Sequence, residues 1–243
     1  MNAMVKLSAL GASQDPADRL EALRLNVRGR IVFTTSFGLE DQAITHFIAE
    51  RKLAIEVATL DTGRLFPSTY QLWDETERKY GLRIASWHPD RDALATFVAE
   101  AGINGFYHSK DARIACCNVR KVAPLGRALA GAQAWVSGLR ADQSGDRGAV
   151  ELASWDEARK LIKLAPLFDW SRDRVADFCA AEGVPVNSLH AEGYLSIGCQ
   201  PCTRATAPGE AERDGRWWWE NDGSRECGLH VGADGKLVRS KAA

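Results

Sequence analysis

Residues 30–52 read RIVFTTSFGLEDQAITHFIAERK, a short β-branched run that reaches a glycine and continues into a helical pattern. A strand followed by a helix recurs over residues 53–80, and two more strands are expected within residues 82–90 and 132–144. Strands that alternate with helices of this length predict an α/β fold, with a mostly parallel sheet covered by helices on both faces. In such sheets ligands bind beyond the carboxyl ends of the strands. The loops expected there are 34–41, 60–64 and 137–147.

The composition excludes several classes of protein. The 243 residues, 45% of them hydrophobic, suffice for one domain with a core, and a net charge of −1 provides no general basic field for nucleic acid. No apolar run approaches the roughly 20 residues that span a bilayer. Acidic residues also occur too early in the first segment for a signal peptide. We expect a cytoplasmic protein without nucleic-acid or membrane partners, whose six cysteines are metal ligands or nucleophiles rather than disulfides.

Four cysteines form two pairs, Cys116-Cys117 and Cys199-Gln-Pro-Cys202. Four such sulfurs suit tetrahedral zinc or a cubane iron–sulfur cluster. Adjacent side chains point apart in a strand, so ligation by both members of the first pair requires a helical or kinked backbone. The tandem pair favours a cluster, because a zinc ribbon usually has CxxC at both ends. Structural zinc and separate roles remain open on spacing alone.

The other two cysteines have different contexts. Cys227 lies in RECGLH near the carboxyl end, where a glycine-punctuated tail suggests a mobile nucleophilic thiol that needs nearby cations such as His230. A surface thiol or a fifth metal ligand are the alternatives. Cys179 shares a helical face with Val175 and Phe178, which is typical of a small buried hydrophobic residue.

Several polar segments suggest an anion site. The turn 34–41 (TTSFGLED) joins a strand to a helix, where backbone N–H groups favour phosphate or sulfate, although hydroxyl capping of the helix also explains it. The segment Leu60–Gly63 suits ribose or adenine edges, or an Asx turn. Cationic side chains follow the tandem cysteines, bracket the loop 140–147 and precede a tryptophan run that we interpret as packing. These cations are Arg120, Lys121, Arg140, Arg147, Arg213 and Arg216.

In their order along the chain, the sequence motifs resemble the assimilatory adenylyl-sulfate (APS) and phosphoadenylyl-sulfate (PAPS) reductases over about residues 31–230. The matching pieces are SFGLEDQ, LDTGRLFPSTY, CCNVRKVAPL, WVSGLRADQSGDR, KLAPLFDW, VPVNSLHAEGYLSIGCQPCTR, GRWWWE and ECGLH. The resemblance implies an ATP-pyrophosphatase-like (adenine nucleotide alpha hydrolase-like) α/β fold. It implies one reductase domain, 1–243, with a nucleotide-binding core and cluster site at 15–210 and a mobile tail at 211–243.

The family's reaction has two steps. Cys227 would attack the sulfur of the bound adenylyl sulfate, expelling AMP and leaving an S-sulfocysteine, and reduced thioredoxin would then release sulfite. The substrate-binding positions carried over are Thr35, Ser36, Phe37, Gly38, Asp41, Gln42, Leu60, Asp61, Thr62, Gly63, Lys121, Arg140, Arg147, Arg213, Arg216 and His230. The positions that correspond to the ligands of one [4Fe–4S] cluster are Cys116, Cys117, Cys199 and Cys202.

The two cysteine pairs also bear on the substrate. Family members that carry both pairs act on APS, so the resemblance favours APS, with PAPS preference or dual specificity as alternatives. The cluster is expected to order Lys121 and the site rather than to pass electrons. Two further alternatives are an ATP-pyrophosphatase that adenylates its substrate, whose usual SGGxDS-type loop is here SFGLED, and a zinc-stapled binding module. The sequence allows a homo-oligomer.

Overall fold

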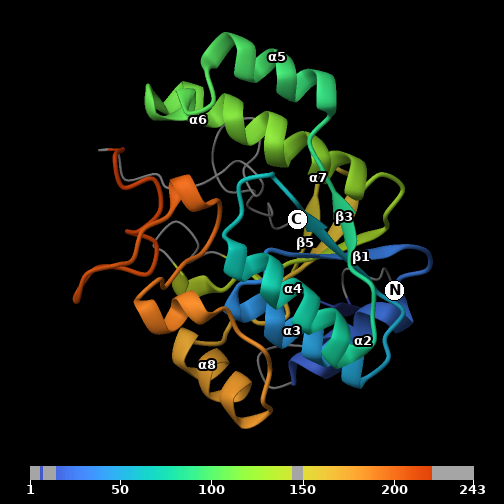
Figure 1. Ribbon diagram of the computed structural model, residues 1–243. Helices are drawn as coiled ribbons and strands as arrows, with labels where there is room; N and C mark the ends of the chain where they lie inside the picture. Colours follow the sequence, from blue (N-terminus) through green and yellow to red (C-terminus); the bar gives the residue numbers. More distant parts are fainter. Residues whose placement is uncertain (1–5, 8–14, 144–149, 221–243) are drawn as a thin grey trace.

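The computed structural model describes residues 6–7, 15–143 and 150–220, and a six-stranded sheet runs through its centre (Figure 1). The strand order is β3-β2-β1-β4-β6-β5, with every neighbouring pair parallel except the antiparallel pair β5 and β6. The predicted α/β fold with a mostly parallel sheet is confirmed. The strands are β1 (Ile31–Thr35), β2 (Glu56–Leu60), β3 (Ala85–Trp87), β4 (Ala134–Val136), β5 (Ala153–Asp156) and β6 (Leu161–Leu164).

Helices cover both faces of the sheet. They are α2 (Pro16–Asn26), α3 (Leu39–Glu50), α4 (Pro67–Tyr80), α5 (Arg91–Ala101), α6 (Lys110–Cys117), α7 (Ala123–Ala128) and α8 (Arg172–Ala181). A π-helical turn, η2 (Asn118–Val122), joins α6 to α7. The 3₁₀ turns are η1 (Gly105–Tyr107), η3 (Ala141–Gln143), η5 (Ser188–Glu192) and η6 (Gln200–Cys202).

Alternating side chains on the strands build the core on two sides. In β1, Ile31 and Phe33 join the cluster that buries α2, α3, α4 and α8. Val32 points the other way and packs with α7, because successive strand residues face opposite sides of a sheet. In Figure 1, α2, α3, α4 and α8 accordingly lie on one side of the strands, and α5, α6 and α7 lie on the other.

Local sequence sets several helix ends as expected. The side chain of Asp15 accepts a hydrogen bond from the Ala17 amide at 2.8 Å, and Pro16 occupies the first turn of α2. Pro67 likewise begins α4, which ends at Gly81 in a left-handed conformation with φ of 61°. Among the described residues, no helix is long and apolar enough to cross a membrane.

The chain changes direction across the sheet at β1. From β1 it builds outward through β2 and β3, and it then returns to add β4 on the opposite side of β1. Such a switch point leaves a crevice beyond the carboxyl ends of the two central strands. The fold therefore presents the loops after β1, β2 and β4 at one edge, as predicted.

The predicted tail boundary at residue 211 falls inside a packed segment. Arg216, Trp217 and Glu220 are all buried, so the tail as far as residue 220 belongs to the body of the protein. The reason is a set of contacts with α6 and the second cysteine pair, which a sequence pattern does not reveal. Cys227 and the rest of the predicted tail lie outside the described residues.

Candidate functional site

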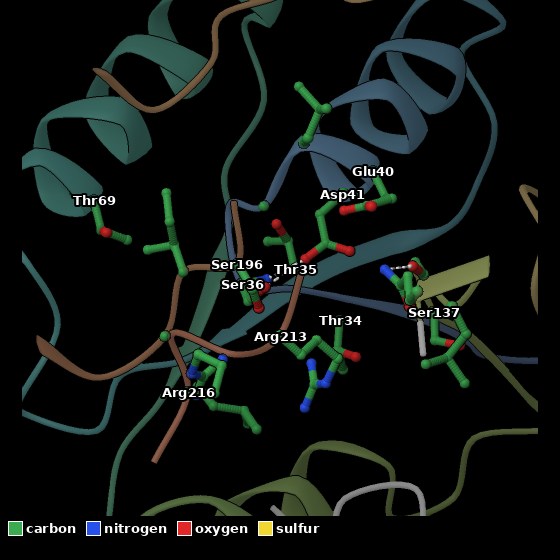
Figure 2. A pocket seen from close by; sticks show the side chains of 18 of the residues that line it. Thr34, Thr35, Ser36, Glu40, Asp41, Thr69, Ser137, Ser196, Arg213 and Arg216 are labelled. Carbon is green, nitrogen blue, oxygen red and sulfur yellow. Dashed lines mark hydrogen bonds between the residues drawn. The ribbon is translucent and has the colours of Figure 1, made fainter. Parts of the chain in front are cut away.

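An open cleft lies at the carboxyl ends of β1, β2 and β4. Figure 2 shows hydroxyl-bearing side chains along it, among them Thr34, Thr35 and Ser36 at the end of β1 and Ser137 after β4. The hydroxyl oxygen of Ser137 is buried and has no hydrogen-bond partner among the described residues. This edge of the sheet is thus lined with groups that can bind a polar ligand.

The turn between β1 and α3 is held by Asp41. The amide and the hydroxyl of Ser36 both donate to Asp41 Oδ2, at 2.6 and 2.8 Å. Phe37 has a positive φ of 60° and is buried against Trp73, with ring centroids 5.7 Å apart. Gly138 closes the other side, since a Cβ there would lie 2.3 Å from Asp41 Oδ1. The backbone of the turn is therefore fixed before any ligand arrives.

Asp41 is also an unusual acid. Burial raises its pKa to about 7, although its hydrogen bonds with Ser36 oppose the shift. The neighbouring Glu40 raises the pKa further. Near neutral pH the carboxyl therefore titrates inside the cleft wall.

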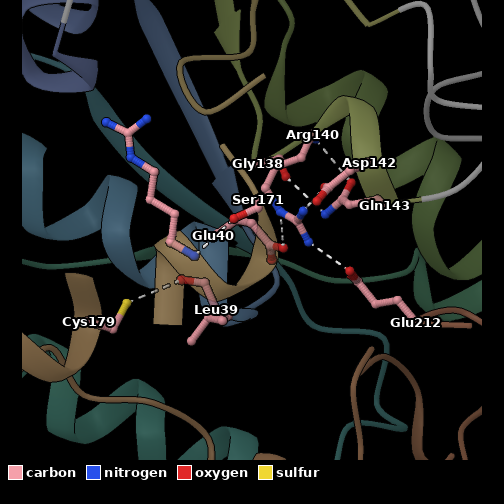
Figure 3. Close-up of polar contacts among 10 residues, drawn as sticks. Leu39, Glu40, Gly138, Arg140, Asp142, Gln143, Ser171, Cys179 and Glu212 are labelled. Atoms are coloured by element: carbon pink, nitrogen blue, oxygen red, sulfur yellow. Dashed lines mark hydrogen bonds and ion pairs between the residues drawn. The ribbon is translucent and has the colours of Figure 1, made fainter. Parts of the chain in front are cut away.

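Three carboxylates surround the buried side chain of Arg140 (Figure 3). Arg140 Nε lies 2.7 Å from Glu40 Oε1, Nη2 lies 2.7 Å from Glu212 Oε2, and Nη1 contacts Asp142. Burial raises the pKa of Glu212, Glu40 raises it further, and Arg140 opposes the shift. Glu40 and Glu212 line the cleft, whereas Arg140 does not. The substrate contact of Arg140 stays a prediction; in the structure its side chain belongs to an ion-pair network that joins α3, the loop after β4 and residue 212.

The cationic side chains of the cleft are Lys121, Arg213 and Arg216. Arg216 is 6% exposed and lies against Gly198, where an added Cβ would approach its guanidinium to 2.3 Å. Glycine at 198 thus allows this close approach. Figure 2 shows Arg213 beside Thr34, whereas Arg216 lies farther from this threonine. The cleft has positive charge from Lys121, Arg213 and Arg216 and negative charge from Glu40 and Glu212.

A second, smaller cavity lies beside the cleft, and all four paired cysteines line it. Cys116 and Cys117 end α6 just before the π-helical turn, which agrees with the helical or kinked backbone that the tandem pair required. Cys199 and Cys202 bracket the short turn η6. The topology therefore brings the two pairs together from positions more than 80 residues apart. Lys121 lines both cavities and so forms part of the wall between them.

Cations surround the cysteine cavity. Burial raises the pKa of the Cys199 thiol, but Lys121, a hydrogen bond with Thr62 and the nearby arginines together bring it below its usual value. Burial raises the pKa of Cys202 to about 11, and Cys199 contributes to the increase. Cys179 is 3% exposed, which confirms its interpretation as a small buried residue, and this burial raises the pKa of its thiol to about 12. The paired cysteines therefore lie in a more cationic setting than the isolated one.

The structure divides the predicted substrate residues into three groups. Those that line the cleft are Thr35, Ser36, Gly38, Asp41, Leu60, Lys121, Arg213 and Arg216. Those that lie elsewhere are Phe37, Gln42, Asp61, Thr62, Gly63 and Arg140. Arg147, Cys227 and His230 lie outside the described residues.

The residues that do not line the cleft have structural contacts. Gln42 is buried and donates to the Thr76 hydroxyl and the Pro185 carbonyl, both at 2.8 Å. Thr62 Oγ1 lies 3.3 Å from Cys199 Sγ, which places it at the cysteine cavity instead. Asp61 accepts from the Tyr70 hydroxyl at 2.8 Å. These side chains hydrogen-bond to neighbouring parts of the protein and do not line the cleft.

Sequence reasoning from the residues missed part of the lining. The segment Ser196–Gly198 lines the cleft directly before Cys199, and Thr69 reaches it from α4. Glu40 and Glu212 also line it. For Ser196–Gly198, the available signal was their position beside a metal-type CxxC pair. Glu40 and Glu212 gave no signal, because in sequence they resemble ordinary surface residues.

Comparisons with known proteins agree with this arrangement. Residues 30–205 match the phosphoadenosine phosphosulfate reductase domain family. The adenosine 5'-phosphosulfate reductase of Agrobacterium fabrum is 53% identical over 225 residues, which cover 93% of this chain and 86% of the relative. The enzyme of that name from Rhizobium meliloti is 56% identical over 219 residues, covering 90% and 82%. That from Allochromatium vinosum is 52% identical over 200 residues, covering 82% and 78%.

Solved structures share the fold. A phosphoadenylyl-sulfate (PAPS) reductase from Candida auris superposes with a TM-score of 0.71 at 24% identity, covering 83% of this chain and 96% of that one. Yeast FAD synthetase superposes with a TM-score of 0.53 at 15% identity, covering 84% and 73%. Both likenesses concern the fold alone, and both agree with the α/β architecture expected.

The raised pKa of Asp41 predicts a pH-dependent stability. The pKa of this carboxyl is near 4 in the unfolded chain and about 7 in the folded protein. The folded state therefore holds the proton more tightly, and the free energy of unfolding decreases as the pH rises from about 4 to about 7. The loss is up to about 1.4 kcal/mol per pH unit. Asp41→Asn keeps the acceptor for Ser36 and should remove this part of the slope, measured by urea unfolding at pH 5 and pH 7.5. An identical slope in the parent and the variant would contradict the prediction.

Proposed function

This chain belongs to the phosphoadenosine phosphosulfate reductase family, and we propose that it reduces adenosine 5'-phosphosulfate to sulfite and AMP. The observation that carries the proposal is the cleft at the switch point of the sheet, into which Lys121, Arg213 and Arg216 bring three cations. A phosphosulfate group is an anion that needs such partners. Relatives that share more than half of their aligned residues with this chain carry the name of that activity.

The reaction would use Cys227 as nucleophile. Its thiolate attacks the sulfur of the sulfo group, the bond from that sulfur to the phosphate oxygen breaks, and AMP leaves with the electron pair. The enzyme then carries an S-sulfocysteine. One thiol of reduced thioredoxin attacks Cys227 Sγ and releases sulfite, and its second thiol resolves the mixed disulfide. The products are Cys227 as a thiol and oxidised thioredoxin, and we place this reaction in the cytoplasm, where dithiols are kept reduced.

The cleft residues would support this chemistry electrostatically. Negative charge grows on the phosphate oxygen as the sulfur–oxygen bond breaks. The fixed cations Lys121, Arg213 and Arg216 would stabilise this charge. The turn after β1, already ordered by Asp41, offers backbone amides at the start of α3.

The charge distribution favours adenosine 5'-phosphosulfate over its 3'-phosphorylated form. Glu40 and Glu212 line the same cleft, and together with Asp142 they provide three carboxyl groups around the single guanidinium of Arg140. A 3'-phosphate adds nearly two negative charges that the three cations would have to share. Repulsion by the carboxylates would therefore select against it.

We propose that the four paired cysteines hold a [4Fe–4S] cluster. Among the described residues, no group of three or more cysteine, histidine or acidic side chains is arranged to hold a single metal ion. A cubane instead binds each cysteine to a different iron, so its four ligands surround a larger space. The buried indole N–H groups of Trp217 and Trp219 have no partner within the described part of the chain and belong to the cluster of side chains around the cysteines. Sulfur-rich inorganic groups accept such donors.

The proposed cluster would contribute to the site through its location beside the cleft and through its charge. Cys116, Cys117, Cys199 and Cys202 would hold it next to Lys121. The cluster would order the wall between the two cavities, while thioredoxin supplies the electrons. This arrangement fits a cationic cavity whose arginines and lysine can balance four thiolates.

Replacing Cys227 with serine should abolish sulfite release, because the hydroxyl cannot form the S-sulfo intermediate. After incubation of the parent with adenosine 5'-phosphosulfate alone, intact mass spectrometry should show one added sulfo group, located on Cys227. Cys179→Ser serves as the control and should retain the adduct, because Cys179 is buried on α8 away from the cleft. Sulfite production by the Cys227 variant would disprove the mechanism.

Replacing Cys199 with serine should remove the proposed cluster. We expect about four iron atoms and four acid-labile sulfides per chain in the anaerobically purified parent, and a large loss of both in the variant. Cys179→Ser should keep the parent's content. Zinc without sulfide in the parent would refute the cluster and favour a structural zinc site.

Replacing Glu212 with glutamine should relax the substrate preference. The variant removes one negative charge from the cleft and leaves Arg140 paired with Glu40 and Asp142. The ratio of kcat/KM for adenosine 5'-phosphosulfate to that for the 3'-phosphorylated substrate should fall by roughly tenfold, as expected for about 1.4 kcal/mol of repulsion. A parent that prefers the 3'-phosphorylated substrate would overturn the proposed specificity.

A further inference from the structure

An ion pair fastens the last described residues to helix α6. Arg113 is 1% exposed, and its Nε and Nη2 donate to Glu220 Oε1 and Oε2, both at 2.8 Å. Such a two-point fork fixes orientation as well as distance. Glu220 is 8% exposed, so both partners are withdrawn from water. The pair joins residues 107 positions apart in the sequence.

Trp217 completes this junction. The Arg113 guanidinium lies 4.5 Å from the centre of the Trp217 ring, and the Arg216 guanidinium lies 4.7 Å from it. The Trp217 amide donates to the Cys202 carbonyl at 3.2 Å, and the Glu220 amide donates to the Trp217 carbonyl at 2.9 Å. Trp217 has a φ of 45°, a conformation that a bulky residue keeps only when its surroundings enforce it.

The junction contacts both cysteine pairs. Arg113 hydrogen-bonds the thiol of Cys117, one helical turn along α6, and the Trp217 amide bonds the carbonyl of Cys202. Residues 217–220 are therefore held by the same elements that bring the four cysteines together. We call Arg113, Trp217 and Glu220 the tail root.

We propose that Arg113 and Glu220 are positioning residues, which fix the point from which the chain continues to the nucleophile. This inference rests on the proposed role of Cys227. Cys227 follows Glu220 by seven residues, so the thiol can lie at most about 25 Å from the root. If the ion pair is lost, the last held residue becomes Trp217, and the limit grows to about 36 Å. The thiol then explores a larger volume and meets the sulfur less often.

The cations of the cleft have separate support. The Arg216 amide donates to the Arg213 carbonyl at 2.9 Å, and a β-bridge joins Thr203 to Arg216. Loosening residues 218–220 should therefore slow the sulfo transfer more than it weakens substrate binding. This difference separates a positioning role from a general loss of structure.

The test uses Glu220→Gln and Arg113→Lys in the full chain, purified anaerobically. Both variants remove the two-point ion pair, and Arg113→Lys keeps the positive charge beside Cys117. Two measurements are made on each variant. Chymotrypsin cleavage after Trp219 reports opening of the tail root, because Trp219 packs in the cluster of side chains around the cysteines and must be released before the chain can be cut there. Single-turnover formation of the S-sulfo adduct from adenosine 5'-phosphosulfate reports positioning.

We expect cleavage after Trp219 to accelerate at least tenfold in both variants. The maximal rate of adduct formation should fall at least threefold, with the half-saturating substrate concentration changed by less than twofold. The double variant should be no worse than the slower single variant, because the two residues act as one pair. If Arg113→Lys does not fold, Glu220→Asp, with a shorter acidic side chain, replaces it.

The control is the ion pair between Arg204 and Glu210, in the same carboxyl-terminal segment but outside the root. It is also a two-point pair, at 2.7 Å for both contacts, and it is partly exposed. Glu210→Gln should leave both readouts near those of the parent.

Two results would overturn the inference: unchanged cleavage after Trp219, or accelerated cleavage with an unchanged rate of adduct formation. A parent that forms no adduct would instead refute the proposed function, while the cleavage rates would still report whether the ion pair holds the root.

Discussion

The parallel pairing of β1 with both β2 and β4 is the constraint on which the rest of the structure depends. Val32 pairs with Glu56 on one side and with Trp135 on the other, so the carboxyl ends of three strands finish at one edge. The turn before α3 and the loop after β4 then meet directly, and Gly138 closes against Asp41. The cleft, its ordered turn and its acidic wall all follow from this register.

Much of the fold could be predicted because its signals are local. Capping at Asp15 and the proline at residue 67 fix where helices begin, and β-branched runs mark the central strands. The antiparallel pair β5 and β6 was missed. In β6 the buried Lys163 places its ammonium 4.9 Å from the centre of the Trp135 ring, so a charged residue interrupts an otherwise apolar strand. A pattern of residue types does not distinguish such a lysine from an exposed one.

The candidate site could be predicted in outline, since its residues lie in loops that the topology brings together. The direction in which each side chain points was harder to predict than the loop or helix on which it lies. Gln42 and Asp41 are neighbours in the sequence, yet Gln42 turns inward to α4 while Asp41 lines the cleft. Arg140 lies in a loop at the cleft, yet three carboxylates retain its side chain. These outcomes depend on partners distant in the chain, whose burial and charge the local sequence does not specify.

Lys121 forms part of the wall of the cleft and part of the wall of the cysteine cavity. One ammonium group therefore contributes to the electrostatic potential on both sides. Its positive charge attracts an anion in the cleft and thiolates in the cysteine cavity at the same time. The two cavities therefore share one source of positive charge, so the loss of this single side chain would make both of them less able to hold negative groups.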